Sequence, residues 1–249
     1  MSKAAALLKY IHEAGYKDWT PEQKAKYNSP EEVAKRKEQR AAKMKEVGDT
    51  PLELLQVYIG KGNKKLDKKI KTFNLPAIKS CPNAGECAKK CYAVKSEKRY
   101  ADVAASRARN FRLAKESTEL LKKKIEAKLK PGDIVRIHES GDMFNQAYLD
   151  MWNSIVSDNP NIMFYTYTKT EDILDWSSIK KHKNFNLVSS MINGEKNFGP
   201  LEQMEIKAKE LNLPLCPCKP GNNVRCGVDC NICMTKSKKG EGGVLFVEH

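Results

Sequence analysis

The spacing of apolar residues changes near residue 70. Before it, the pattern predicts polar helices with only thin apolar stripes. Residues 20–23 and 29–32 each place a Thr or Ser cap before a proline and an acid or amide, which is typical of a helix start. We expect one helix from Pro30 to about Val47 and a more apolar one from Thr50 to Gly60.

After residue 70, short runs of β-branched and aromatic residues alternate with longer amphipathic segments. The runs predict strands at Lys71–Ile78, Asp133–His138, Ile162–Thr168, Phe185–Met191, Leu213–Cys216 and Val244–Glu248. The segments between them predict helices at Ala101–Lys130, Gln146–Ser157, Ile173–Lys180 and Leu201–Leu211. Apolar strands that alternate with helices are typical of a parallel sheet covered by helices.

This alternation predicts an α/β fold. Six strands fit a partial (β/α)6 barrel, similar to a TIM barrel, better than a closed eight-stranded one, for which 249 residues are few. A doubly wound sheet is the alternative. Residues 1–60 are expected to form a charged helical extension, and residues 61–249 a β/α core with a cysteine-rich segment towards its C-terminal end. In either fold, ligands bind beyond the carboxyl ends of the strands.

The chain has eight cysteines but neither a signal-peptide pattern nor an apolar run long enough to span a membrane. We therefore expect a cytoplasmic protein without a membrane partner, in which cysteines bind metal rather than form disulfides. Cys81, Cys87 and Cys91 follow the first predicted strand. Three thiolates on one loop can hold three irons of a 4Fe–4S cluster and leave the fourth iron open, or supply three ligands of a zinc ion.

A second group of five cysteines lies in eighteen residues near the C-terminal end. Proline and glycine interrupt this stretch, so an ordinary strand or helix does not explain it. Four thiolates close a coordination shell, and the spacing favours Cys216, Cys226, Cys230 and Cys233, with Cys218 as the spare. The metal is either structural zinc or a second 4Fe–4S cluster, since spacing alone does not separate them.

Polar residues gather where the predicted strands end. Ser140, Gly141 and Asp142 form a turn in which glycine would let a ligand approach the backbone, although an ordinary strand-to-helix turn explains them equally well. Other strand-end or helix-face residues could contact a ligand, or could be capping, structural or solvated groups: His138, Thr166, Thr168, Lys169, Ser189, Ser190, Arg107, Arg109, Asn110 and Arg112.

The positive charge is concentrated in the first half of the chain. Residues 1–130 hold 32 Lys and Arg against 16 Asp and Glu, whereas residues 131–249 hold 13 against 15. Such asymmetry suggests a surface for a polyanion, with nucleic acid as the first candidate, although lysine-rich solvated helices have the same composition.

Several of these motifs together resemble the bacteriophage "gene product 88" proteins, a family similar to radical S-adenosylmethionine (SAM) enzymes. They are the early cysteines with the following Tyr92, Glu139–Phe144, Phe164–Lys169 and the cysteine-rich end, over about residues 55–249. The early spacing (five, then three intervening residues) departs from the usual three and two, which instead occurs at Cys226, Cys230 and Cys233.

The resemblance implies a partial barrel in which Cys81, Cys87 and Cys91 bind a 4Fe–4S cluster with an open iron for SAM. It implies that Ser140, Gly141 and Asp142 lie at the amino group of the cofactor and that Tyr92 packs beside it. Thr166, Thr168 and Ser189 are further expected cofactor contacts. A phage protein of this kind would work in the host cytoplasm with a reductase or a flavodoxin-type electron donor.

The leading hypothesis is therefore a SAM-dependent enzyme that generates a 5′-deoxyadenosyl radical and acts on nucleic acid or a nucleotide-derived substrate. The first alternative is a non-catalytic nucleic-acid-binding phage protein stapled by zinc or an iron–sulfur cluster. The second is a redox or group-transfer enzyme that has a cluster but no SAM site.

Overall fold

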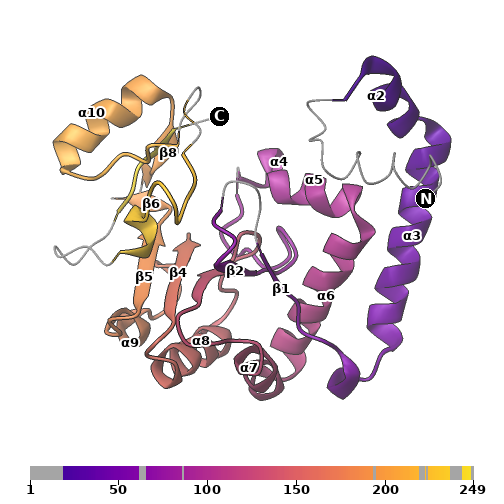
Figure 1. The fold of residues 1–249 in the computed structure, drawn as a ribbon, viewed down its shortest axis with the longest axis horizontal. Helices are drawn as coiled ribbons and strands as arrows, with labels where there is room; N and C mark the ends of the chain where they lie inside the picture. Colours follow the sequence, from indigo (N-terminus) through magenta and orange to yellow (C-terminus); the bar gives the residue numbers. More distant parts are fainter. Residues whose placement is uncertain are drawn as a thin grey trace.

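The computed structural model describes residues 19–61, 66–85, 87–192, 195–218, 222, 224–235 and 243–247. At its N-terminal side, α2 (Pro21–Tyr27) begins with a capping box formed by Thr20 and Gln23, and α3 (Pro30–Asp49) begins at Ser29, whose hydroxyl accepts a hydrogen bond from the Glu32 amide. Both helix starts confirm the predictions. Helix α3 packs along α6 at one side of the molecule, and α10 lies at the opposite side (Figure 1).

The remaining elements alternate between helices and short strands. The helices are η2 (Leu52–Leu54), α4 (Cys87–Lys90), α5 (Tyr92–Arg99), α6 (Ala101–Glu116), α7 (Thr118–Glu126), α8 (Gln146–Asp158), α9 (Ser177–Lys180), α10 (Leu201–Leu211) and η3 (Ile232–Met234). The strands are β1 (Ile59–Gly60), β2 (Ile70–Phe73), β3 (Ile134–Ile137), β4 (Met163–Thr168), β5 (Phe185–Ser189), β6 (Met191–Ile192), β7 (Glu195–Lys196), β8 (Phe198–Gly199) and β9 (Phe246–Val247).

The main sheet has the order β1-β2-β3-β4-β5. Strands β2 to β5 are parallel and β1 pairs antiparallel with β2. Short pairs form between β6 and β7 and between β8 and β9. The protein is thus an α/β chain with a partly parallel sheet. Spatial order follows chain order in this sheet, without the reversal that marks a doubly wound fold; a six-stranded partial barrel stays a prediction.

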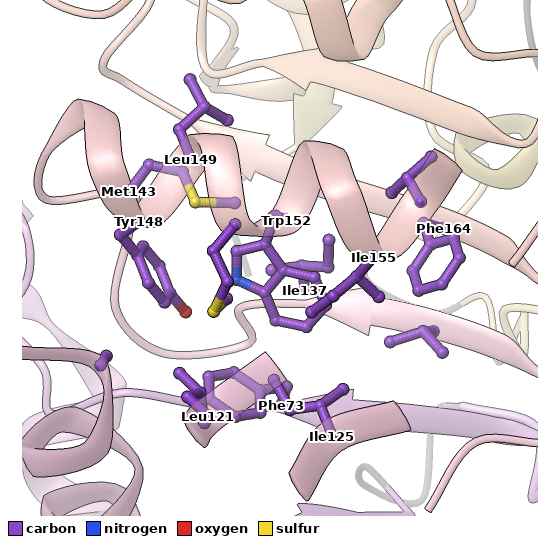
Figure 2. Close-up of a cluster of buried hydrophobic side chains, with 14 of the residues drawn as sticks. Phe73, Leu121, Ile125, Ile137, Met143, Tyr148, Leu149, Trp152, Ile155 and Phe164 are labelled. Atoms are coloured by element: carbon purple, nitrogen blue, oxygen red, sulfur yellow. The ribbon is translucent and has the colours of Figure 1, made fainter. Parts of the chain in front are cut away.

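One face of the sheet forms the main hydrophobic core with helices α6 to α9. Phe73, Ile137 and Phe164 point to this face, and the buried side of α8 packs on them with Tyr148 and Trp152 (Figure 2). Trp152 and Tyr148 are fully buried, and the Trp152 ring contacts Phe73 edge-on at 5.3 Å between ring centroids. Burial of these aromatic rings fixes α8 against the strands.

The opposite face of the sheet packs against segments that lie far apart in the sequence. Ile70 and Tyr165 form a smaller cluster there with Leu66 and with Met234 of η3. Cys226 and Cys233 pack against the same cluster. The late cysteines therefore cover the face of the sheet that the helices leave open.

Two helix predictions are wrong. Residues 50–60 form η2, an extended segment and β1 rather than one helix. The reason is the Asn110 side chain: its oxygen accepts a hydrogen bond from the Tyr58 amide (2.8 Å), and its NH2 group donates one to the Tyr58 carbonyl (2.9 Å). The predicted helix 101–130 is two helices that break at Ser117, whose extended backbone and hydroxyl cap α7. In addition, 173–180 is helical only over its last four residues.

Several strands are shorter than predicted. β2 ends at Phe73, since turns occupy residues 77–80 and Ile78 has a left-handed φ of 68°. Leu213–Cys216 is not a strand and has only a bridge between Leu215 and Leu245, while at the C-terminal end only Phe246–Val247 pairs and Glu248 lies outside the described residues. Leu55 and Val57 lie in the main core, so this part of the chain packs with it. The division into an extension, residues 1–60, and a core, residues 61–249, stays a prediction.

Candidate functional site

The early cysteine loop (residues 77–92, described except Glu86) crosses the carboxyl ends of three parallel strands. It follows β2, and its Ser80 carbonyl accepts a hydrogen bond from the Asp142 amide beyond β3 (3.0 Å). Its Asn83 amide donates to the Lys169 carbonyl beyond β4 (2.6 Å). The loop is thereby anchored at the edge of the sheet where parallel α/β folds bind ligands.

The turn after β3 requires glycine where it meets this loop. Gly141 has a φ of 93°, and a Cβ there would lie 2.6 Å from the Ser80 hydroxyl and 2.7 Å from Leu75 Cβ. The Ser140 hydroxyl donates to the Leu75 carbonyl (2.9 Å). The Asn74 side-chain oxygen accepts from the amides of Glu139 and Ser140 (2.7 and 3.0 Å). Turn and loop therefore form one fixed unit.

The three early thiols lie in one electrostatic neighbourhood. Burial is the main reason that the pKa of the Cys81 thiol is raised to about 11, and the nearby Asp142 carboxylate and the Cys91 and Cys87 thiols contribute to this rise. Cys81 and Cys91 are half-buried and Cys87 is exposed. No disulfide joins any of the eight cysteines, all of which are described.

The polar residues predicted to contact the cofactor mostly bond within the protein. The Asp142 carboxylate accepts hydrogen bonds from the Met143 and Lys169 amides and the Thr168 hydroxyl (2.8, 3.0 and 2.7 Å). Burial raises the Asp142 pKa to about 6, although these hydrogen bonds oppose the shift. The buried Thr166 hydroxyl donates to the Ile137 carbonyl (2.8 Å).

Tyr92 and Ser189 differ from these residues because their side chains reach the surface. Tyr92 is 59% exposed, and its hydroxyl donates to the Glu139 carbonyl (2.5 Å), so the residue next to Cys91 leans over the turn after β3. Ser189 is half-buried at the end of β5. Contact with a cofactor stays a prediction for all seven residues named for it: Tyr92, Ser140, Gly141, Asp142, Thr166, Thr168 and Ser189.

The late cysteines surround a small cavity on the other face of the sheet. This late cysteine cavity, of about 40 Å³, is lined by Cys216, Cys226, Cys230, Cys233, Tyr165 and Tyr167 together with apolar residues. Cys218 is not among its lining residues. The cavity thus brings together the four thiols that the spacing favoured and leaves the spare one aside.

Backbone contacts shape this cavity. The Gly227 amide donates to the Cys230 carbonyl (2.7 Å), and the Asp67 amide donates to the Cys226 carbonyl (2.8 Å). Gly227 has a φ of 85°, and a Cβ there would lie 2.7 Å from Ile70 Cδ1. Glycine is therefore needed for the cysteine segment to approach β2 closely.

Burial and nearby cysteines favour the protonated thiol at Cys216 and Cys233. Burial, together with the neighbouring cysteines, raises the pKa of Cys216 to about 11 and that of Cys233 to about 12. A hydrogen bond from Tyr167 to Cys233 acts in the opposite direction. In the part of the chain that the structure describes, no group of three or more Cys, His, Asp or Glu side chains is placed so that it could hold a metal ion.

A family model places the chain among known proteins. The model of Gene product 88 matches residues 35–209, more than half of the chain. The chain belongs to the Gene product 88 family. The match contains the early cysteine loop and the turn after β3, and it ends before the five late cysteines.

Two curated Gene product 88 relatives come from mycobacterial phages. The Gene 88 protein of Mycobacterium phage L5 is 30% identical over 129 residues, which cover 46% of this chain and 54% of the relative. That of Mycobacterium phage D29 is 28% identical over 148 residues, covering 54% and 62%. The chain thus spans little more than half the length of the curated relatives it matches. No solved structure matches it, and no described helix is long and apolar enough to cross a membrane.

Two of the three arginines on α6 of this Gene product 88 protein have structural partners, whereas the Nε of Arg109 is buried without a hydrogen-bond partner. Arg107 pairs with Glu97 (2.9 Å) and donates to the Ala93 carbonyl. Arg112 donates to the carbonyls of Val47, Gly48 and Thr50 and so ties α3 to α6. Both guanidinium groups therefore make structural contacts within the protein.

Arg136, on β3, was not singled out from the sequence. Alternation along β3 turns it away from the main core, towards Tyr165 and Tyr167. Its guanidinium lies 4.7 Å from the centre of the Tyr167 ring, and its Nε is buried without a hydrogen-bond partner. A charged residue inside an otherwise apolar four-residue strand is the signal that could have revealed it.

Proposed function

We propose that this Gene product 88 protein is an iron–sulfur enzyme. In this proposal Cys81, Cys87 and Cys91 hold a 4Fe–4S cluster whose open iron binds SAM. The observation that carries the proposal is the anchoring of the early cysteine loop across the carboxyl ends of β2, β3 and β4. Three thiols at that edge supply three ligands and leave the fourth iron to a cofactor.

The early thiols fit such a cluster chemically. The groups that act on the Cys81 thiol, besides its own loop backbone, are two thiols and a carboxylate, all of which raise its pKa. Bound iron would supply the positive charge that favours the thiolate. When bound and reduced, the cluster supplies the electron that cleaves SAM to methionine and a 5′-deoxyadenosyl radical, which abstracts hydrogen from a substrate.

The protein's own residues position this site. Ser140 and Asp142 hold the turn and the loop together through buried hydrogen bonds, so we assign them a positioning role. Tyr92 is exposed and Ser189 is half-buried near the carboxyl ends of the strands, and both remain predicted cofactor contacts. The sequential parallel strands, with helices on one face, support a partial barrel of the radical-SAM type as the fold of this core.

The late cysteine cavity is proposed to hold a second metal. Cys216, Cys226, Cys230 and Cys233 provide four thiols, which suit structural zinc or a 4Fe–4S cluster. Both would pull the proton from thiols whose pKa burial has raised.

Anaerobic purification and metal analysis test the proposal. We expect a brown protein with about four irons per chain if the late site holds zinc, or about eight if it holds a second cluster. Cys91→Ser should remove the early cluster, and with it any change in the electron paramagnetic resonance spectrum when SAM is added to the reduced protein. Incubation with dithionite and SAM should yield 5′-deoxyadenosine from the unaltered protein.

The late site has a matched control within the chain. Cys230→Ser should lower the content of the second metal, whereas Cys218→Ser should leave it unchanged, because Cys218 does not line the cavity. Equal losses in both variants would contradict this ligand set.

A colourless protein that contains only zinc would refute the enzyme and favour a metal-stapled nucleic-acid-binding protein. In that case binding of nucleic acid should weaken steeply as salt increases, because residues 1–130 carry the excess of positive charge. Intact iron clusters without 5′-deoxyadenosine would refute the use of SAM. The expected electron donor is a reductase or a flavodoxin-type protein.

A further inference from the structure

The face of the sheet between the two cysteine groups contains an arginine that forms no ion pair with a described residue. Arg136 lies on β3 in register with Thr72 of β2 and Tyr165 of β4. Among the described residues, none accepts a hydrogen bond from its guanidinium or forms an ion pair with it, and its buried Nε lacks a partner. Arg136 as a whole is half-buried.

The neighbours of Arg136 place it between the two cysteine groups. Tyr92, Tyr165, Tyr167 and Glu139 are the titratable groups close enough to act on it. Tyr92 follows Cys91 in the early cysteine loop, whereas Tyr167 hydrogen-bonds to Cys233 in the late cysteine cavity. One guanidinium thus lies near a tyrosine from each cysteine group.

An arginine in this setting costs stability unless a ligand uses it. A partly desolvated cation loses hydration, and the attraction of a neutral aromatic ring such as that of Tyr167 replaces only part of it. A planar guanidinium with free donors fits the two oxygens of a carboxylate or a phosphate group.

We propose that Arg136 binds an anionic group, a carboxylate or a phosphate, of a ligand that lies on the sheet face between the early cysteine loop and the late cysteine cavity. The anion could belong to a substrate or to the carboxylate of SAM, and the two sources share this chemistry. The binding step itself does not depend on the proposed radical enzyme, which only decides what happens to the ligand.

The test is titration calorimetry of the purified full-length chain with inorganic phosphate and with succinate, at constant ionic strength. Arg136→Gln should weaken binding at least about tenfold, as expected when a charge-assisted hydrogen-bond pair is lost. Arg40→Gln, on α3 far from the sheet face, removes the same charge and should bind like the unaltered protein. Equal affinity of Arg136→Gln and the unaltered protein, or no binding to either, would overturn the proposal.

A second measurement uses the unaltered protein and therefore does not require that the Arg136→Gln variant folds. The Nε–H resonance of Arg136 in the unaltered protein should shift as phosphate is added, and an unmoved resonance would overturn the proposal. We expect Arg136→Gln to fold, because the guanidinium makes no hydrogen bond to a described residue.

Comparing SAM with decarboxylated SAM separates the two sources of the anion. If the Arg136→Gln change weakens binding of SAM but not of its decarboxylated form, the anion is the cofactor's; if it changes neither while phosphate binding is lost, the anion is a substrate's. Both results support the site. Failure of the radical chemistry would appear as missing 5′-deoxyadenosine and leaves the phosphate result untouched.

Discussion

His138 should lower the free energy of unfolding as the pH falls, an effect that the opposite contribution of Asp142 masks in the unaltered protein. It lies directly after β3, is 3% exposed, and stacks on Tyr148, whose hydroxyl is 2.9 Å from its Nε2. Its Nδ1 is buried without a partner. Burial therefore favours the neutral ring and lowers the His138 pKa from 6.5 to about 3.

The sign and size of this pH effect follow from the difference between the His138 pKa in the folded and the unfolded state. A histidine whose pKa is lowered by folding contributes stability above pH 6.5, and this contribution is lost as the pH falls through 6.5 towards 3. At pH 4.5 the loss is about 2.7 kcal/mol, from 1.36 kcal/mol per unit over two units. Asp142 acts in the opposite direction, because burial raises its pKa from 3.8 to about 6 and protonation then favours the folded state by about 2 kcal/mol at pH 4.5.

The two terms nearly cancel in the unaltered protein, so a variant is needed to separate them. His138 has a left-handed φ of 66°, a region that asparagine tolerates, and His138→Asn keeps this backbone while it removes the titrating ring. Urea unfolding at pH 7.5 and pH 4.5 gives the free energy of unfolding of both proteins. We expect the unaltered protein to lose about 2.7 kcal/mol relative to the variant between these pH values.

Loss of thiolate-bound metal in acid would affect both proteins alike and cancels in this comparison. Nuclear magnetic resonance supplies a direct check, since the His138 ring proton should not titrate between pH 7.5 and 4.5. A ring that titrates near pH 6.5, together with parallel pH profiles for the two proteins, would refute the reasoning.

Two further predictions concern stability. Gly141→Ala should lower the free energy of unfolding by at least about 3 kcal/mol, since it combines a left-handed φ with contacts below 3.0 Å. Gly132→Ala has a similar φ but nothing within 4 Å and should lower it by only about 1 kcal/mol in urea unfolding. Equal losses would contradict the steric argument. Asn110→Ala removes three hydrogen bonds to the backbone of Tyr58 and Asn74 and should cost about 2–4 kcal/mol, with faster amide exchange in β1 as its specific sign; unchanged exchange there would contradict the anchoring role.

The order of strands and helices follows from local patterns in the sequence. The helix starts at residues 20–23 and 29–32 depend on side chains that cap their own backbone, and α8 depends on apolar residues at helical spacing. Residues 50–60 show where this fails. Their apolar pattern permits a helix, but Asn110, more than fifty residues away, binds the Tyr58 backbone and holds the chain extended.

The candidate site divides in the same way. Cysteine spacing alone indicated the four thiols that line the late cavity, because a metal shell requires ligands at short intervals on a turning chain. The sequence also placed the early cysteines and Ser140–Asp142 at strand ends, where parallel strands meet at one edge. It could not show that Asp142 would use its carboxylate to hold Thr168 and Lys169 rather than face a ligand.

By itself, the sequence determined the α/β alternation and the helix caps, since these depend on residues close along the chain. Only the tertiary structure decided that the early loop is anchored across three strand ends and that the late cysteines cover the second face of the sheet. It also decided that Arg136 lies on this face with a buried Nε that has no hydrogen-bond partner. The physical reason is that burial, hydrogen-bond pairing and desolvation are properties of contacts between distant segments, and local spacing does not encode them.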